Sequence, residues 1–306
     1  MAVAAPGVWR ARGAAGWRRI LLRSEPLRGY ALLSPTLVVM IVGLGFAVVL
    51  LLAFSFWSQD YLTVVREFTS VNYEAFVSKR LYSALLFRSI GISALVTLVT
   101  VVLAYPCAYF IAFHVKRRKL VWLALITAPF LTSYLLRVFA WKIILGYEGV
   151  INSALLSVGL IDEPLGFLLY SRTAVILTLA HAWAAFALLP IYVSLEKIDR
   201  TLLEAATDLG DGPVARFLRV TLPLSMPGVI SAGLLVFIPT VGDYVTPSLV
   251  GGTEGLMIGN LIQSQFGKAN NWPLGAALSV ASMVVVTFLV CAFLGLSRVA
   301  QRRLIA

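Results

Sequence analysis

Six long apolar runs constrain the fold more than any other feature of this 306-residue sequence. They cover about residues 30–56, 87–113, 120–146, 173–195, 225–249 and 273–297. A helix needs roughly 20 apolar residues to cross about 30 Å of hydrocarbon, and each run is long enough. Only 13% of the residues are charged, whereas a soluble domain carries about a quarter. The sequence therefore predicts an all-α integral membrane protein with six transmembrane helices.

The basic residues predict how these helices are oriented. Of the 25 Lys and Arg, 17 fall in four segments, residues 1–29, 114–119, 196–224 and 297–306. Cytoplasmic loops of membrane proteins are rich in Lys and Arg, so we expect these segments and both termini in the cytoplasm. The loops expected outside are 57–86, 147–172 and 250–272. This topology, with attraction to anionic headgroups, explains the net charge of +11 better than nucleic-acid binding does.

The domain organisation predicted from this pattern is simple. Residues 1–29 form a basic cytoplasmic segment, and residues 30–306 form one transmembrane domain. The two His residues stand alone, both Cys residues fall inside apolar runs, and the sequence has no CxxC pair or phosphate-binding glycine motif. We therefore expect no metal, cofactor or catalytic site on this chain, and any nucleotide chemistry has to come from a partner.

The long loop at 196–224 differs from the other loops because it contains helix-capping signals. Thr201 and Glu204 stand at capping-box spacing, and Asp199 is an alternative N-cap. Gly210 can adopt positive φ and end this first helix. The helix either packs on its own domain or docks on a soluble partner.

A second short helix is expected directly after Gly210. Asp211 is placed to cap it, and Pro213 falls in its first turn. Leu222-Pro223 is expected to end it before the fifth span begins. The loop is thus predicted to form two short helices bent at Gly210, outside the bilayer.

This loop resembles the "EAA" loop of the permeases of ABC importers. The resemblance lies in Glu204-Ala205-Ala206, in Gly210, and in Val220-Thr221-Leu222-Pro223, at the spacing of that family. It implies a type I ABC importer permease (MetI-like) fold in a bacterial inner membrane, and a transport subunit rather than an enzyme. It also implies that the first helix is a coupling helix held in a groove of an ATPase. The residues expected to couple are Glu204, Ala205, Ala206, Asp208 and Gly210.

The same resemblance implies the other parts of the machine. They are a second, homologous permease, a dimer of ATP-binding subunits that holds ATP and Mg, and an extracytoplasmic substrate-binding protein. Further strings resemble the spermidine/putrescine branch, among them Pro129–Ser133, Arg137–Trp141 and Val241–Gly252. This branch implies polyamines as cargo. Iron(III), an aminophosphonate or another small solute remains an alternative for the same machinery, and an ion-gradient-driven secondary transporter is an alternative of another class.

Asp243 is the acidic residue beside the fifth span, where burying an unpaired carboxylate is costly. Gly242 and Pro247 favour a broken helix end there, which would free backbone carbonyls toward a cavity. A carboxylate next to the aromatic ring of Tyr244 could attract an alkylammonium group by charge and by cation–π contact. We therefore expect Asp243 and Tyr244 on a path for a cationic substrate.

Other interpretations of these residues remain open. Asp243 either caps the end of a helix or pairs with a nearby base, Arg137, Lys142 or Arg172. Arg137 and Lys142 are expected to face a partner permease, to extend toward the membrane interface or to neutralise buried acids. Tyr134 and Trp141 are further candidates for the substrate path, although aromatic residues of membrane helices also serve in packing.

Overall fold

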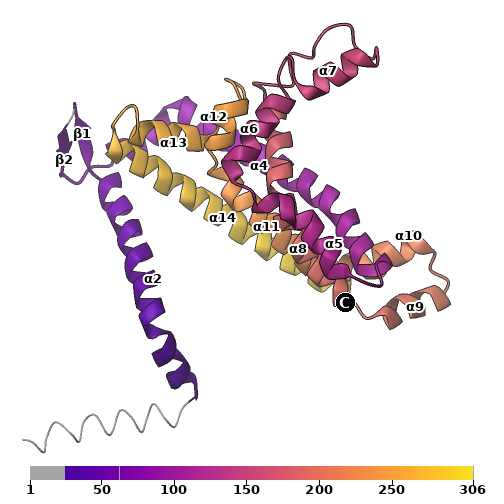
Figure 1. Ribbon diagram of the computed structural model, residues 1–306. Helices are drawn as coiled ribbons and strands as arrows, with labels where there is room; N and C mark the ends of the chain where they lie inside the picture. Colours follow the sequence, from indigo (N-terminus) through magenta and orange to yellow (C-terminus); the bar gives the residue numbers. More distant parts are fainter. Residues whose placement is uncertain (1–24, 62, 306) are drawn as a thin grey trace, which may run out of the picture. The chain divides into compact units, whose positions relative to one another are not determined.

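The computed structural model describes residues 25–61 and 63–305. The chain divides into two compact units, Met1–Phe54 and Ser55–Ala306, which are described separately. Most of the predicted basic segment at 1–29 lies outside the described residues. The described part of the first unit is a single helix, α2 (Glu25–Ser55), drawn in indigo in Figure 1. Apolar side chains are exposed along it, from Leu32 to Leu52, as expected of a helix that faces lipid.

The second unit is almost entirely helical. Before the loop at 196–224 it contains β1 (Ser58–Asp60), β2 (Thr63–Val65), α3 (Val71–Ser78), α4 (Arg80–Tyr109), α5 (Lys119–Thr127), α6 (Tyr134–Ile144), α7 (Val150–Ser157) and α8 (Arg172–Glu196). The later elements are α9 (Arg200–Asp208), α10 (Pro213–Arg216), α11 (Leu222–Val241), α12 (Val245–Val250), α13 (Ile258–Phe266) and α14 (Trp272–Ile305). Two π-helical turns extend α4 over Phe110–His114 and precede α11 over Phe217–Thr221. The two strands pair antiparallel, with Ser58 opposite Val65.

The prediction of an all-α, six-span protein is confirmed, with one difference in the third span. Among the described residues, five helices are long and apolar enough to cross a membrane, and one bent pair would be the sixth. The bent pair joins Lys119–Leu131 to Tyr134–Ile144 at 84°. Pro129 lies in a 3-10 turn, and the two residues after that turn are extended, so the predicted helix over 120–146 does not run straight.

The fifth span begins earlier than the sequence predicts. The prediction that Leu222-Pro223 ends the second short helix is wrong, because α10, the π-helical turn and α11 run on without a break. Leu222 N–H donates to Phe217 O in the π pattern, and this wider turn accommodates Pro223, which has no N–H. The break expected near Gly242 is present, because α11 ends at Val241 and α12 starts at Val245.

Three helices, α4, α8 and α11, pack on one another and form the core of the second unit. Val96, Leu179 and Val236 are fully buried between them. The backbones of α8 and α11 come close at Gly228 of α11, where an added Cβ would lie 2.4 Å from Ser194 Cβ and 2.5 Å from Pro190 O. Small residues at such positions let membrane helices approach each other closely.

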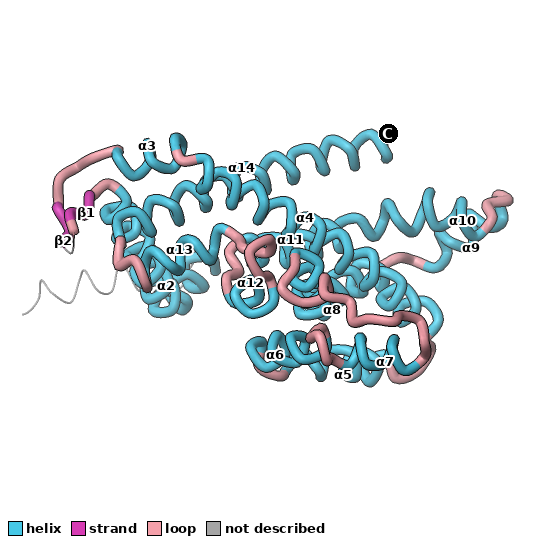
Figure 2. Tube along the Cα trace, turned by 90° about the horizontal axis from the view of Figure 1, so that it is seen from above, coloured by secondary structure: helices cyan, strands magenta, loops and turns pink. Residues whose placement is uncertain are grey.

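Two pairs of short helices lie toward the two ends of the second unit. Figures 1 and 2 show α9 and α10 at one end and α12 and α13 toward the other, with the C-terminal part of α14 running toward the α9 end. An ion pair joins two chain segments at the α9 end, because Lys119 Nζ lies 2.8 Å from Glu196 Oε2. This pair connects the start of α5 to the last residue of α8, at the start of the loop at 196–224.

Candidate functional site

The coupling helix predicted from the sequence is α9, and its N-cap is Asp199. Asp199 Oδ1 accepts a hydrogen bond of 3.0 Å from Thr201 N–H. The sequence allowed two caps, and the structure has the Asp199 N-cap, whereas the Thr201–Glu204 capping box does not form. The backbone hydrogen bond from Thr201 stabilises the charged carboxylate and lowers the pKa of Asp199 below its ordinary value.

The two sides of α9 have different environments. Leu203 and Ala206, three residues apart, pack toward the protein, and Ala206 is buried. Glu204, Ala205 and Asp208 are exposed. Four of the five residues expected to couple, with Gly210 the fourth, therefore lie at the surface, and Ala206 anchors the helix to its own domain.

Gly210 has φ +88°, as predicted for the residue that ends this helix. The prediction that Asp211 caps the second helix is wrong. Gly212 is the N-cap of α10, and Asp211 Oδ1 instead pairs with Arg219 at 2.7 Å. Arg216 donates to Thr207 Oγ1 at 2.8 Å and so holds α10 against α9.

A cavity of about 330 Å³ lies at the break between α11 and α12. Its walls come from α6, α8, α11 and the residues after α11. They are Tyr134, Arg137, Ala182, Trp183, Phe186, Pro239, Gly242, Asp243 and Tyr244. Three of the four residues expected on a substrate path, Tyr134, Asp243 and Tyr244, thus line one cavity, although more than 100 positions separate Tyr134 from the other two in the sequence.

Asp243 makes hydrogen bonds on both carboxylate oxygens. Oδ2 accepts from the Tyr134 hydroxyl at 2.5 Å, and Oδ1 accepts from Val245 N–H at 2.9 Å. The Tyr134 oxygen also lies 2.6 Å from Thr246 Oγ1. Asp243 therefore accepts from the first residue of α12, whose N-cap is Tyr244, and it also holds the hydroxyl of Tyr134. No base of the described chain lies within ion-pair distance of Asp243.

Sequence reasoning did not place Arg137 in this cavity, although a signal was present. Arg137 follows Tyr134 by three residues, so a helix brings both side chains to one face. Its guanidinium carbon lies 5.4 Å from the Phe130 ring centre and 5.9 Å from that of Tyr134. Nη1 donates to Ala182 O at 3.0 Å. Trp183, also missed, lies one residue beyond that carbonyl on α8, a position that the sequence alone does not relate to Asp243.

Trp141 is the one expected path residue that does not line the cavity. It lies two turns along α6 from Tyr134, and its ring centre is 5.4 Å from that of His181. Trp141 also packs against the hydrophobic core, which is the packing role that the sequence left open. Lys142 Nζ lies 5.9 Å from the centre of the Tyr170 ring.

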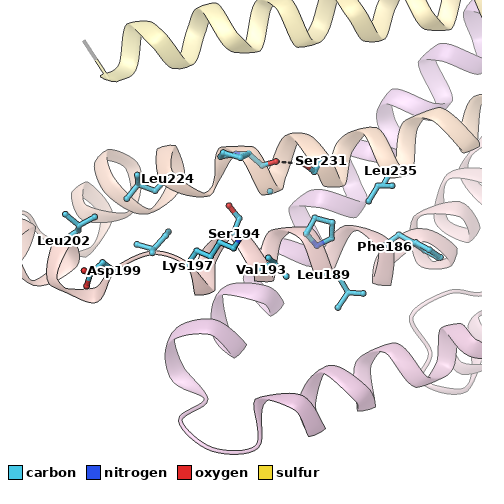
Figure 3. Close-up of a pocket in the computed structure, with 14 residues that line it drawn as sticks. Phe186, Leu189, Val193, Ser194, Lys197, Asp199, Leu202, Leu224, Ser231 and Leu235 are labelled. Atoms are coloured by element: carbon cyan, nitrogen blue, oxygen red, sulfur yellow. Dashed lines mark hydrogen bonds between the residues drawn. The ribbon is translucent and has the colours of Figure 1, made fainter. Parts of the chain in front are cut away.

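A groove of about 760 Å³ runs between α8 and α11 (Figure 3). Lys197, Asp199 and Leu202 line its end near α9, and Phe186 and Leu235 line the other end. Phe186 also lines the Asp243 cavity. The cavity and the groove are therefore neighbours on one face of the molecule, with Phe186 between them.

The chemistry of the cavity suits a bound cation. A carboxylate attracts positive charge, and the aromatic rings beside it offer negative π faces. Within the described residues, no three His, Cys, Asp or Glu side chains are grouped so that they could hold a metal ion.

These features define a membrane permease, and comparison with known proteins identifies its family. Residues 79–305 match the family of binding-protein-dependent transport system inner membrane components. The chain belongs to this family and is an integral membrane protein.

Two relatives narrow the family further. The chain is 34% identical to the spermidine/putrescine transport system permease protein PotB of Haemophilus influenzae over 255 residues, 83% of this chain and 88% of that protein. It is 36% identical to PotB of Escherichia coli K12 over 250 residues, 81% of this chain and 90% of the relative. A solved bacterial ABC transporter for the acidic polysaccharide alginate has the same fold, with TM-score 0.69 and 17% identity over 94% of this chain and 98% of that one.

Proposed function

We propose that this chain is a permease subunit of an ATP-driven ABC importer and that its cargo is a polyamine, spermidine or putrescine. The observation that supports this cargo best is the cavity in which Asp243 meets the rings of Tyr134 and Tyr244 at a helix break. Two relatives that match over most of this chain are named as spermidine/putrescine permeases, which agrees with a cationic cargo.

The proposed path runs from the Asp243 cavity along the face shared by α8 and α11. The amine would bind first at Asp243 and pass Phe186, which lines both spaces. It would then follow the groove toward Lys197 and Asp199, at the α9 end. A homologous second permease would complete the walls of this path.

The proposed machine places α9 in the cytoplasm, with both termini on the same side. The exposed Glu204, Ala205, Asp208 and Gly210 would dock on a dimer of ATP-binding subunits, which holds ATP and Mg. An extracytoplasmic binding protein would deliver the substrate at the α12–α13 end. A solved alginate transporter in complex with its periplasmic protein is an example of such an assembly in a protein of the same fold.

The cargo is tested by the ATPase activity of the complete reconstituted transporter with its binding protein. The panel contains spermidine, putrescine, iron(III) and an aminophosphonate. We expect stimulation by the polyamines, and loss of this stimulation in Asp243→Asn. Asp162→Asn, in the loop between α7 and α8, is the matched control and should behave as wild type. Stimulation by another solute alone would contradict the cargo and leave the permease class intact.

The coupling role of α9 is tested separately with Glu204→Lys and Gly210→Pro. Both variants should insert into the membrane and hydrolyse ATP without substrate-dependent uptake. Glu67→Lys, between β2 and α3, is the control for the charge change. Wild-type uptake by both α9 variants would exclude α9 as the coupling helix.

One observation favours a second cargo with the same machinery. The guanidinium of Arg137 and the carboxylate of Asp243 line one cavity, and this pair of charges suits a zwitterion such as an aminophosphonate. The solute panel separates the two candidates, because a polyamine has no anionic group for Arg137.

A further inference from the structure

Arg137 is the one cationic side chain among the residues that line the Asp243 cavity. In the described chain it makes no ion pair within 4.0 Å, so it does not neutralise Asp243 by direct contact. Its Nε is buried and has no hydrogen-bond partner. A permanently charged guanidinium with unused N–H donors is unexpected in the lining of a path that is proposed to admit a polycation.

The guanidinium lies on the aromatic surface that a substrate amine would use. It lies 5.4 Å from the Phe130 ring centre and 5.9 Å from that of Tyr134, both within cation–π range. The Tyr134 ring is in turn held by Asp243 and Thr246. The acid that would attract the substrate therefore also orients the ring that the arginine covers.

The attachment of this guanidinium is limited. One hydrogen bond, from Nη1 to Ala182 O at 3.0 Å, holds it to the backbone of α8. An arginine has five N–H donors, so most of its donors are not used by this contact. Arg137 can be displaced from the rings at the cost of one backbone hydrogen bond and two cation–π contacts.

We propose that Arg137 is an internal counter-cation that competes with the substrate's ammonium group for the rings and the field of Asp243. This inference rests on the proposed polyamine function and makes Arg137 a specificity-determining residue of that site. Like charges in a low-dielectric cavity repel, so the substrate binds only weakly while Arg137 is present. Weak binding is useful in a transport path, because a site that holds its solute tightly releases it slowly.

The test compares charge-removing and charge-preserving substitutions in the complete reconstituted transporter. Arg137→Gln and Arg137→Met remove the charge, and Arg137→Lys keeps it. We expect the neutral variants to need about tenfold less spermidine for half-maximal uptake, a change that corresponds to about 1.4 kcal/mol. Their maximal rate of uptake should be lower. Arg137→Lys should remain near wild type. Two neutral variants are used in case one of them misfolds, and thermal unfolding identifies a misfolded variant.

Lys142→Gln is the matched control, since Lys142 lies on the same helix over Tyr170 and outside the cavity. It should leave both the half-maximal concentration and the maximal rate unchanged. An unchanged or higher spermidine requirement in the neutral Arg137 variants would overturn the counter-cation role, and so would equal behaviour of the Lys and Gln variants. In both cases polyamine stimulation of the wild type would survive, and with it the proposed function. Stimulation of the wild type by an aminophosphonate alone would overturn both proposals.

Discussion

The contact at Gly228 predicts how much stability depends on the approach of α8 and α11. An alanine there would place its Cβ 2.4 Å from Ser194 Cβ and 2.5 Å from Pro190 O, about 1 Å inside ordinary contact. One obstacle is backbone, so the helices have to separate. Such overpacking costs about 2 kcal/mol, and the change from glycine to alanine in a helix returns up to about 1 kcal/mol.

Gly233 on the same helix provides the control that isolates the steric cost. An added Cβ there meets Thr97 Cγ2 at 3.7 Å, an ordinary contact. The gain in helix propensity from glycine to alanine is the same in both variants, so it cancels when the two are compared. Gly228→Ala should therefore be about 2 kcal/mol less stable than Gly233→Ala, which lowers the unfolding temperature by about 3 °C for a chain of this size.

The assay is thermal unfolding of the purified protein in detergent, followed by tryptophan fluorescence. Adding Ser194→Gly to Gly228→Ala removes the side-chain obstacle and should recover part of the loss, while the Pro190 carbonyl retains the rest. Equal unfolding temperatures of the two alanine variants would refute the reasoning, because the close approach would then have no energetic consequence.

Three further predictions concern the α9 end. The pKa of Asp199 is lowered in the folded protein, so its cap stabilises α9 fully above the unfolded carboxyl pKa of about 4. This stabilisation is lost as the pH falls through the lower folded pKa, and amide exchange of α9 should accelerate there. Asp199→Asn should show no such acceleration, because its side-chain amide caps the helix at any pH. Gly210→Ala should destabilise the α9–α10 turn by about 1 kcal/mol because φ is +88°. Gly212→Ala, at φ −67°, loses only a glycine N-cap and should cost less, as amide exchange of α9 would show; equal effects would exclude positive φ as the cause. A double-mutant cycle on Lys119 and Glu196 should give a salt-sensitive coupling energy below about 1 kcal/mol, since both side chains are partly exposed. A larger coupling energy that does not depend on salt would contradict this description of the ion pair.

The sequence predicted the parts of the fold that follow from hydrophobic length and local turn chemistry. Apolar runs define the spans because each must cover the hydrocarbon, and Gly210 defines a helix end because it adopts positive φ without strain. The end of α11 near Gly242 was predictable from the nearby Gly242 and Pro247, although Gly242 ends the helix with negative φ. The prediction of a helix end at Pro223 was wrong because proline usually breaks a helix, whereas here a π-helical turn accommodates it.

The candidate site was predicted less completely, because it depends on which helix faces meet. Asp243 stood out as an acid at a membrane span, and its contact with Tyr134 joins positions 109 residues apart. Helical spacing puts Tyr134, Arg137 and Trp141 on one stripe of α6, but it does not say how far along that stripe the cavity extends. The structure includes Arg137 and not Trp141. That boundary is set by α8 and α12, which no local pattern in the third span encodes.

The bend in the third span has a consequence for how the protein is assembled in the membrane. The 11 residues of α6 extend only about 16 Å, roughly half the thickness of the hydrocarbon, so α6 cannot cross the bilayer by itself. It packs instead on α8 and α12, both of which follow it in the chain. During synthesis α6 therefore emerges before its supports exist. The wall that contains Tyr134 and Arg137 can take its final position only after the ribosome has made residues up to Val250.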